Sequence, residues 1–409
     1  MSIVISGARL IDGTGREPMD HAVIEIEGKR IVSVAPGAEV KRPAGDFTEI
    51  NAAGRALLPG LFDTHCGILR TIASERHDHL SQKNMAASVL RAVVNGRRAL
   101  AAGVTTVRVD ASPHHGIFAL KEAFASGMLD GPRIAAPGQA ITMTGGHAWY
   151  ENREADGPDE VRKAAREQLK AGADWIKLMV TAGAGGQFAN ESPEQTQMTY
   201  EEVKAAVEEA HKKGRPAFAH VSCEEGARTA IAAGIDSIEH GLFLDDGIVQ
   251  AMKDKGVFLV PTLWLYRRLV ELGEKGEIPE WKAKRAASVV PRHLESFQRA
   301  LRAGVKIATG TDSGEVYTPI GESLLHEMET LYGAGMSAME VIISATSRAA
   351  ELLRMTADLG TVQPGKVADL LILDGDPLTD IKAVYRTWMV FKEGRLVYRM
   401  DEKAGRPVH

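Results

Sequence analysis

The sequence predicts a (β/α)8 TIM barrel with a small composite β-sandwich domain built from both ends of the chain. Three observations lead to this fold class: the length of 409 residues, a repeated helix–glycine–strand unit in the middle, and short alternating strands at both ends. The content of 44% hydrophobic and 25% charged residues is typical of a globular protein with one large domain and an accessory domain.

The first and last segments of the chain share one pattern. Residues 1–57 contain short alternating runs such as "AVIEIEGKRIVSV", separated by glycine-containing turns, which is typical of antiparallel strands. Residues 356–409 have the same pattern in "ADLLILDGDP" and "TWMVFKEGRLVY". Each segment is too small to bury a core alone, so we expect the two to join into one β-sandwich. The remaining residues, 58–355, are then the barrel.

The middle of the chain repeats a helical segment that ends at glycine and is followed at once by an apolar run. Glycine is the residue that most readily ends a helix in the left-handed conformation, and helix then strand, repeated, predicts parallel strands. Two further runs, "LLPGLFDTH" and "GPRIAAPGQAIT", bring the number of strands to eight. A doubly wound open sheet is the alternative that the strand count does not exclude. The repeats are "LAAGVTTVRVD", "LKAGADWIKLMV", "HKKGRPAFAH", "IAAGIDSIEH", "KDKGVFLVPT" and "LRAGVKIATGTD".

The overall charge and the cysteine content narrow the classes of partner and compartment. The net charge of -5 is spread without long single-sign runs, so we expect a small-molecule substrate and neither nucleic acid nor membrane. The N-terminal "MSIVISGARLIDG" lacks the features of a signal peptide, and Cys66 and Cys223 are too few for a disulfide scaffold. These features predict a cytoplasmic protein, and we expect a homo-oligomer because symmetric assemblies are common.

Polar residues end most of the predicted strands, and a barrel builds its active site from the C-terminal ends of its strands. Each residue taken singly has a structural alternative: a histidine at a strand end is often a hydrogen-bonded rim residue, and an aspartate often caps a helix. Three histidines, an aspartate and a buried lysine at the same end of one barrel would be a curious accident, and imidazole and carboxylate oxygen are the ligand types of zinc-like ions. The candidates in chain order are Asp63, His65, Arg108, Asp110, His147, Lys177, His220, His240 and Asp312.

Lys177 is the candidate with the fewest structural explanations. It lies within "DWIKLMV", and parallel strands are covered on both faces, so its side chain is expected to point into the barrel. An unpaired ammonium group is costly to bury there. The position therefore favours a functional role for this lysine.

His65 after "GLFD", Lys177, His220, His240 and Asp312 in "GTD" resemble, in order and spacing, the amidohydrolase superfamily. The segment "GTVQPGKVADLLILDGDP" is similar to its composite β-sandwich, and "TGGHA", "IKLMVTAGAGG", "FAHV", "SIEHG" and "VPTL" to its prolidase-like and imidazolonepropionase-like branch. The resemblance implies one or two divalent ions, with zinc as the expected metal, bridged by a carboxylated Lys177. It also implies that His220 and His240 hold the more exposed ion, and that His65 and Asp312 hold the more buried one.

Gly67 departs from this pattern, because the superfamily has a second histidine two residues after His65. Residues i and i+2 of a strand share a face, so here only His65 can reach the buried ion. The centre is then mononuclear, or binuclear with another ligand, or empty. Cys66 points to the opposite face of a regular strand, and four other histidines lie in predicted loops nearby: His77, His79, His114 and His115.

The resemblance implies metal-dependent hydrolysis of an amide-type C–N bond, and its branch implies N-acyl amino acids or Xaa-Pro dipeptides as substrates. Asp312 would act as general base and then general acid. His147 would stabilise the oxyanion or bind a substrate carboxylate, and Tyr266, Arg108 and Arg267 are further candidates for substrate binding. The alternatives are a urea, carbamate or thiocarbamate hydrolase for a neutral xenobiotic, with an apolar wall, and a catalytically silent scaffold. The candidates for that wall are Trp149, Phe188 and Trp264.

Overall fold

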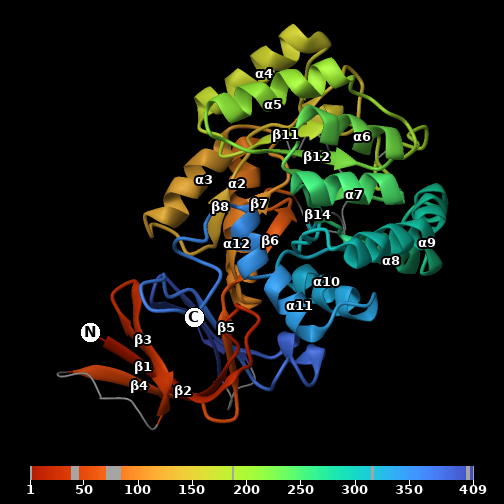
Figure 1. The fold of residues 1–409 in the computed structure, drawn as a ribbon. Helices are drawn as coiled ribbons and strands as arrows, with labels where there is room; N and C mark the ends of the chain where they lie inside the picture. Colours follow the sequence, from red (N-terminus) through yellow and green to blue (C-terminus); the bar gives the residue numbers. More distant parts are fainter. Residues whose placement is uncertain are drawn as a thin grey trace.

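The structure is a computed structural model that describes residues 2–37, 46–70, 84–186, 188–314, 317–401 and 406–408. Strands from both ends of the chain lie together in one sheet, at the end of the molecule that carries both termini (Figure 1). These strands are β1 (Ser2–Leu10), β2 (Met19–Glu27), β3 (Arg30–Pro36), β4 (Phe47–Asn51), β5 (Ala56–Pro59), β15 (Leu370–Leu373), β16 (Thr387–Lys392), β17 (Arg395–Asp401) and β18 (Arg406–Val408).

The nine-stranded sheet has the order β18-β17-β16-β15-β5-β1-β2-β3, and β4 also pairs with β1. The strand β5 joins the two ends of the chain, because it pairs with β1 on one side and with β15 on the other. Alternate residues such as Ile5, Ile24 and Ile372 are fully buried in one apolar cluster, as the alternating pattern predicts. The division into domains at residues 57 and 356 stays a prediction.

Two parallel sheets form the middle of the chain, which confirms the predicted α/β class. One sheet has the order β6-β7-β8 and the other β10-β9-β11-β12-β13-β14. Their strands are β6 (Leu61–Cys66), β7 (Val104–Val109), β8 (Arg133–Ala135), β9 (Ile141–Thr142), β10 (Arg153–Glu154), β11 (Ile176–Met179), β12 (Ala217–Val221), β13 (Ser237–His240) and β14 (Phe258–Val260).

The predicted eighth strand, residues 305–312, is not a regular strand. It makes two isolated parallel bridges, Leu259 with Ile307 and Cys66 with Ser313, which link it to β14 on one side and to β6 on the other. Between the segments of β8 and β11, the Asp174 nitrogen donates to the Ala136 oxygen at 2.8 Å, but the described residues of these two strands do not form a continuous ladder. In the middle of the chain, strand pairing among the described residues therefore forms two separate parallel sheets. A closed barrel stays a prediction.

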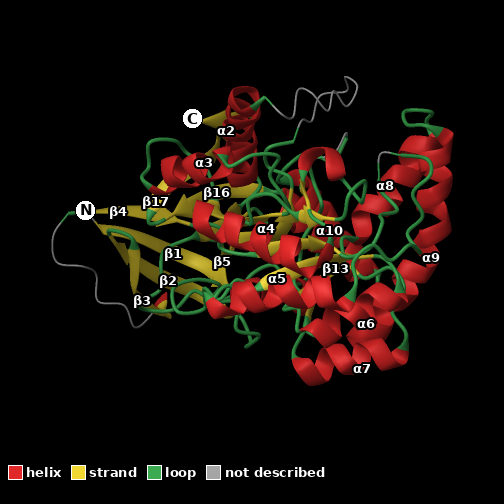
Figure 2. Ribbon diagram, turned by 90° about the horizontal axis from the view of Figure 1, so that it is seen from above, coloured by secondary structure: helices red, strands yellow, loops and turns green. Residues whose placement is uncertain are grey.

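Helices surround the two parallel sheets in the middle of the chain (Figure 2). Four of them end at a glycine with positive φ, namely Gly172, Gly234, Gly256 and Gly304, which confirms the predicted helix ends. The helices are α2 (Met85–Ala101), α3 (Gly116–Ala125), α4 (Gly157–Ala171), α5 (Tyr200–Lys212), α6 (Glu224–Ala233), α7 (Asp246–Lys255), α8 (Leu263–Glu274), α9 (Glu280–Ala303), α10 (Glu322–Gly333), α11 (Ala338–Ser344) and α12 (Ser347–Leu352), with short 3₁₀ turns η2 (Trp149–Glu151) and η3 (Ile381–Tyr385).

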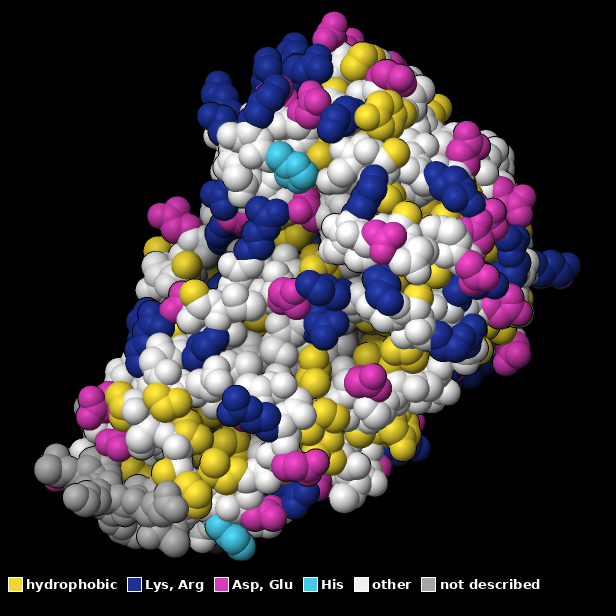
Figure 3. Space-filling view, viewed as in Figure 1, with side chains coloured by type: hydrophobic (Ala, Val, Ile, Leu, Met, Phe, Trp, Pro, Cys, Tyr) yellow, Lys and Arg dark blue, Asp and Glu magenta, His cyan; other side chains and the backbone are white. Residues whose placement is uncertain are grey.

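The surface carries charges of both signs. Lysine and arginine side chains alternate with aspartate and glutamate over the face in Figure 3, without a large single-sign area. Within the part of the chain that the structure describes, no helix combines the length and apolar character needed to cross a membrane.

Candidate metal centre

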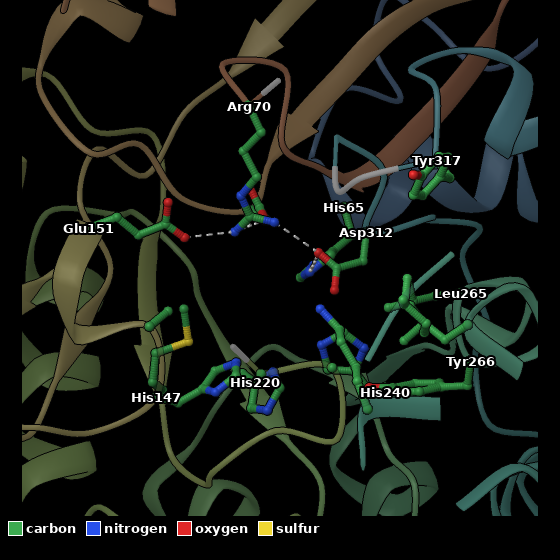
Figure 4. Close-up of a pocket in the computed structure, with 18 of the residues that line it drawn as sticks. His65, Arg70, His147, Glu151, His220, His240, Leu265, Tyr266, Asp312 and Tyr317 are labelled. Atoms are coloured by element: carbon green, nitrogen blue, oxygen red, sulfur yellow. Dashed lines mark hydrogen bonds and ion pairs between the residues drawn. The ribbon is translucent and has the colours of Figure 1, made fainter. Parts of the chain in front are cut away.

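The predicted ligands meet in one cavity of about 370 Å³ at the C-terminal ends of the parallel strands. His65 comes from β6, Lys177 from β11, His220 from β12 and His240 from β13, and Asp312 is the last residue of the irregular eighth segment. All five line the cavity. The ring centroids of His65 and His240 are 5.2 Å apart, and those of His220 and His240 are 4.6 Å apart (Figure 4).

Hydrogen bonds on the far side of the imidazoles leave one ring nitrogen of each for an ion. His65 Nδ1 lies 2.8 Å from Glu239 Oε2, and its Nε2 lies 3.6 Å from Asp312 Oδ1. His240 Nδ1 lies 2.7 Å from Thr262 Oγ1, which leaves Nε2. His220 Nε2 lies 3.3 Å from the carbonyl oxygen of Ala182, which leaves Nδ1. Such outer partners fix ring orientation in metal sites.

The electrostatics of the cavity keep two of the imidazoles neutral. Burial, followed by the charge of neighbouring histidines, holds the pKa of both His220 and His240 well below its usual range. A neutral imidazole is the form that binds a metal ion. Both rings are therefore ready to bind a cation without first losing a proton.

Lys177 is buried, and its Nζ has no hydrogen-bond partner within the described structure. Burial lowers the pKa of this amine to about 8, and Nζ lies 4.6 Å from the centroid of the Phe218 ring. Buried polar groups are rarely left unpaired. A carboxylated lysine would replace this amine by an anion held on a cation, so the residue fits the ligand that the resemblance implies.

Asp312 lies at the rim of the same cavity with a left-handed backbone, φ 54°. Its backbone nitrogen donates to the His65 oxygen at 2.7 Å, which fixes the carboxylate beside that imidazole. Burial opposes ionisation, but the hydrogen bond and charge of His65 and the charge of Arg70 lower the pKa of Asp312 well below its usual range. The carboxylate is therefore ionised. His65, His240 and Asp312 also place one potential ligand atom each within 4.8 Å of one another.

Arg108 is not placed as predicted. Its side chain is fully buried and does not line the cavity: one terminal nitrogen donates to both carboxylate oxygens of Glu239 at 2.9 Å, and Nε donates to the Thr64 oxygen at 2.6 Å. The guanidinium also lies 4.2 Å from the Phe218 ring. Arg108 thus supports Glu239 beneath the cavity, and the expected role in substrate binding does not fit this position.

Glu239 is a functional candidate that the sequence reasoning missed. It is fully buried, and it contacts both Arg108 and the predicted ligand His65. Although burial opposes ionisation, the charge of Arg108 and the hydrogen bond with His65 lower the pKa of Glu239 to about 2. The signal was present in the sequence, because a glutamate inside a predicted parallel strand, which is covered on both faces, requires a buried partner.

His147 lines the cavity as predicted, and its ring stacks on His220 with centroids 4.4 Å apart. Its Nδ1 lies 2.9 Å from Glu191 Oε2, a second residue that the sequence reasoning missed. Gly183 permits this approach, because a Cβ at that position would overlap the His147 ring. The glycine-rich loop after β11 therefore holds His147 beside the candidate ligands.

The apolar wall of the cavity differs from the one expected. Tyr266 lines the cavity as predicted, whereas Trp149, Phe188 and Trp264 are not among the lining residues, and neither is Arg267. Trp149 instead stacks with Phe188, at 6.3 Å between centroids. The wall is formed by residues of α8, α9 and the segments beside them: Leu265, Leu269, Ile278, Trp281 and Tyr317.

His114 and His115, the two alternative histidines within the described residues, are not among the residues that line the cavity. His115 Nε2 lies 3.0 Å from the Gln168 side chain, and His114 Nδ1 accepts a hydrogen bond from the Gly116 nitrogen. His77 and His79 lie outside the described residues. Arg70, which was not predicted, reaches the cavity from the segment after Gly67.

Comparisons with known proteins show the family to which the chain belongs. Residues 56–397 match the model of the Amidohydrolase family. An ochratoxinase of Aspergillus niger is 31% identical, over 96% of this chain and 84% of the relative. A solved Xaa-Pro dipeptidase with bound methionine is 33% identical, with a TM-score of 0.86 and coverage of 97% of this chain and 99% of that one. A prolidase complexed with N-methylphosphonate-L-proline is 28% identical, with a TM-score of 0.86 and coverage of 98% and 100%. The chain therefore belongs to the amidohydrolase family and is a hydrolase of carbon–nitrogen bonds.

Proposed function

We propose that the protein hydrolyses the amide bond of N-acyl amino acids or Xaa-Pro-type dipeptides with the help of a bound divalent ion. Zinc is the metal that we propose. The observation that carries the proposal is the meeting of His65, Lys177, His220, His240 and Asp312 in one cavity that has an apolar wall. The names of the relatives, an ochratoxinase and an Xaa-Pro dipeptidase, support this substrate class.

The ion would be held by Nδ1 of His220, Nε2 of His240 and a carboxylated Lys177, with His65 and Asp312 beside them. These nitrogens are the ones left by the outer hydrogen bonds described above. A divalent ion in such a site lowers the pKa of a water molecule toward neutrality and polarises the carbonyl oxygen of the substrate.

Asp312 moves the protons of the reaction in this proposal. Its ionised carboxylate accepts a proton from the attacking water and then donates that proton to the leaving nitrogen. The backbone beside His65 holds this carboxylate in position, because the Asp312 nitrogen donates to the His65 carbonyl oxygen at 2.7 Å. Because the same carboxylate serves both steps, removal of its acidity should reduce turnover more than binding.

His147 binds the substrate oxygen or carboxylate in this proposal. Glu191 Oε2 occupies Nδ1 of the ring, so Nε2 is the nitrogen that meets the substrate. The stacking of His147 on His220 keeps this nitrogen close to the candidate ligands. A donor fixed in advance beside the reacting carbonyl stabilises the developing negative charge.

The wall of α8 and α9 selects the substrate. Leu265, Leu269 and Trp281 favour a large apolar or aromatic group on one side of the scissile bond. Lys282 lines the same cavity and is the cationic partner that we propose for the carboxylate of the amino-acid part. A neutral urea, carbamate or thiocarbamate would use the apolar wall without this lysine.

The test is a substrate panel with the zinc-loaded protein, in which N-acyl amino acids and Xaa-Pro dipeptides stand beside anilides and phenylureas. We expect the first two classes to be hydrolysed faster, and Asp312→Asn to lower kcat about 10²- to 10⁴-fold. Faster hydrolysis of the phenylureas would favour the neutral-substrate alternative. No hydrolysis of any compound by protein with bound metal would favour the catalytically silent scaffold.

A further inference from the structure

We infer that the guanidinium of Arg70 takes the place of a second metal ion, so that the protein binds a single divalent ion per chain. The inference rests on the proposed function for the first ion, and it explains why Gly67 stands where the superfamily has a histidine.

The side chain of Arg70 fills the space that a side chain at Gly67 would need. A Cβ at Gly67 would lie 2.6 Å from Arg70 Cδ and 3.1 Å from both Cγ and Nε. The φ of Gly67 is not positive, in contrast to that of Gly314 nearby, so the backbone conformation does not require glycine here. Space is therefore the reason for Gly67, and a histidine at this position would displace Arg70.

The backbone that carries Arg70 is fixed by several hydrogen bonds. The Gly67 nitrogen donates to the Ser313 oxygen at 2.7 Å, and the Arg70 nitrogen donates to the Gly67 oxygen at 2.8 Å. Asn95 Nδ2 donates to the carbonyl oxygens of Ile68 at 2.8 Å and of Arg70 at 3.2 Å. This tight turn after β6 directs the arginine side chain back over Gly67 and into the cavity.

The guanidinium lies among three carboxylates that come from different parts of the chain. Its terminal nitrogens are 2.8 Å from Asp110 Oδ2, 3.1 Å from Glu151 Oε1 and 3.4 Å from Asp312 Oδ1. Figure 4 shows Arg70 between Glu151 and Asp312, on the side of Asp312 away from His240. Asp110 and Glu151 are both buried. A cation is required at this point, and Arg70 supplies it with a planar group that can contact several carboxylates at once.

The remaining groups suffice for one ion. His65, His240 and Asp312 are the one group of at least three histidine, cysteine, aspartate or glutamate side chains that meets as potential ligands in the described ranges. With Lys177 and His220 beside them in the cavity, these groups supply enough nitrogen and oxygen ligands for one ion. A second ion next to Asp312 would stand against the positive charge of Arg70.

The test is the metal content of purified protein after zinc loading and removal of excess zinc, measured by mass spectrometry and by competition with a chromophoric chelator. We expect about one ion per chain in the wild type. We expect a second ion in the double variant Gly67→His with Arg70→Ala, which restores the histidine and frees its space. Arg70→Ala alone should take up a second, weaker ion, because three carboxylates lose their cation. Arg166→Ala, which removes an exposed arginine paired with a glutamate, is the matched control and should keep one ion.

The outcomes separate this inference from the proposed function. Two ions in an active wild type would overturn the role of Arg70 and leave the amide hydrolase in place. No ion and no hydrolysis in the wild type would overturn both. If the double variant does not fold, the Arg70→Ala protein decides: one ion, held as tightly as in the wild type and with no weaker ion, would contradict the inference.

Discussion

The substitution Glu239→Gln tests the buried support of the candidate metal centre. Glu239 accepts two hydrogen bonds from Arg108 at 2.9 Å, one from Ser237 at 2.6 Å, and contacts His65 Nδ1 at 2.8 Å. Both Glu239 and Arg108 are 0% exposed. The glutamine keeps the shape of the side chain and removes its charge, so that the guanidinium remains buried without a counter-ion.

The expected loss follows from this burial. Removal of one partner of a buried ion pair costs about 3–5 kcal/mol, because the other charge stays uncompensated. For a chain of this length, an unfolding entropy of about 2.1 cal/mol/K per residue converts that cost into a melting temperature lower by about 4–6 °C. Loss of the outer partner of His65 should also weaken zinc binding about 10- to 100-fold.

The assay is thermal unfolding of the metal-free protein, together with zinc titration against a competing chelator. Glu280→Gln, in an exposed pair with Lys284, is the matched control and should leave the melting temperature nearly unchanged. The double variant Arg108→Met with Glu239→Leu should cost less than the sum of the single changes, because it leaves no buried charge. A Glu239→Gln protein as stable as the control, with unchanged zinc affinity, would refute this reasoning.

Three further predictions follow from the same contacts. The pKa of Glu239 falls from 4.5 to about 2 on folding, so its contribution to the free energy of unfolding is complete above pH 4.5 and is lost as the pH falls toward 2. Urea unfolding at a series of acidic pH values should therefore show a free energy of unfolding that depends less on pH in Glu239→Gln than in the wild type. Lys177→Met should stabilise the metal-free protein by about 1–3 kcal/mol, since it removes an unpaired buried amine, and should abolish tight zinc binding; a less stable variant in a chelator-containing melt would contradict this. Arg285 donates to the carbonyl oxygens of Ala184, Gly186, Phe188 and Glu191, so Arg285→Met should raise KM and speed proteolysis of residues 184–191 with little change in melting temperature. Unchanged cleavage in limited proteolysis would show that this loop is held by other contacts.

Much of the secondary structure could be predicted because its signals are local. The glycines at the ends of α4, α6, α7 and α9 mark the boundary between helix and strand within a few residues of sequence. The run "VKIATG" has the same pattern, yet it makes only isolated bridges, because pairing depends on neighbours that are distant in the sequence. Apolar patterning alone does not determine a regular ladder.

The candidate site could be predicted in part, since parallel strands bring their C-terminal ends to one edge. This rule places His65, Lys177, His220 and His240 in the same cavity. The rule fails for Arg108, because the side chain of a strand residue can point beneath the cavity instead of into it. It also misses Arg70, whose partners Glu151 and Asp312 are 81 and 242 residues away in the sequence. Only the tertiary structure brings these charges together.

The most direct test of the central claim is anomalous diffraction from crystals of the zinc-loaded protein. The account predicts a zinc peak bounded by His220 Nδ1, His240 Nε2 and an elongated, carboxylated Lys177 side chain. A peak at any other place, or a zinc-loaded crystal in which these three side chains hold no ion, would contradict it.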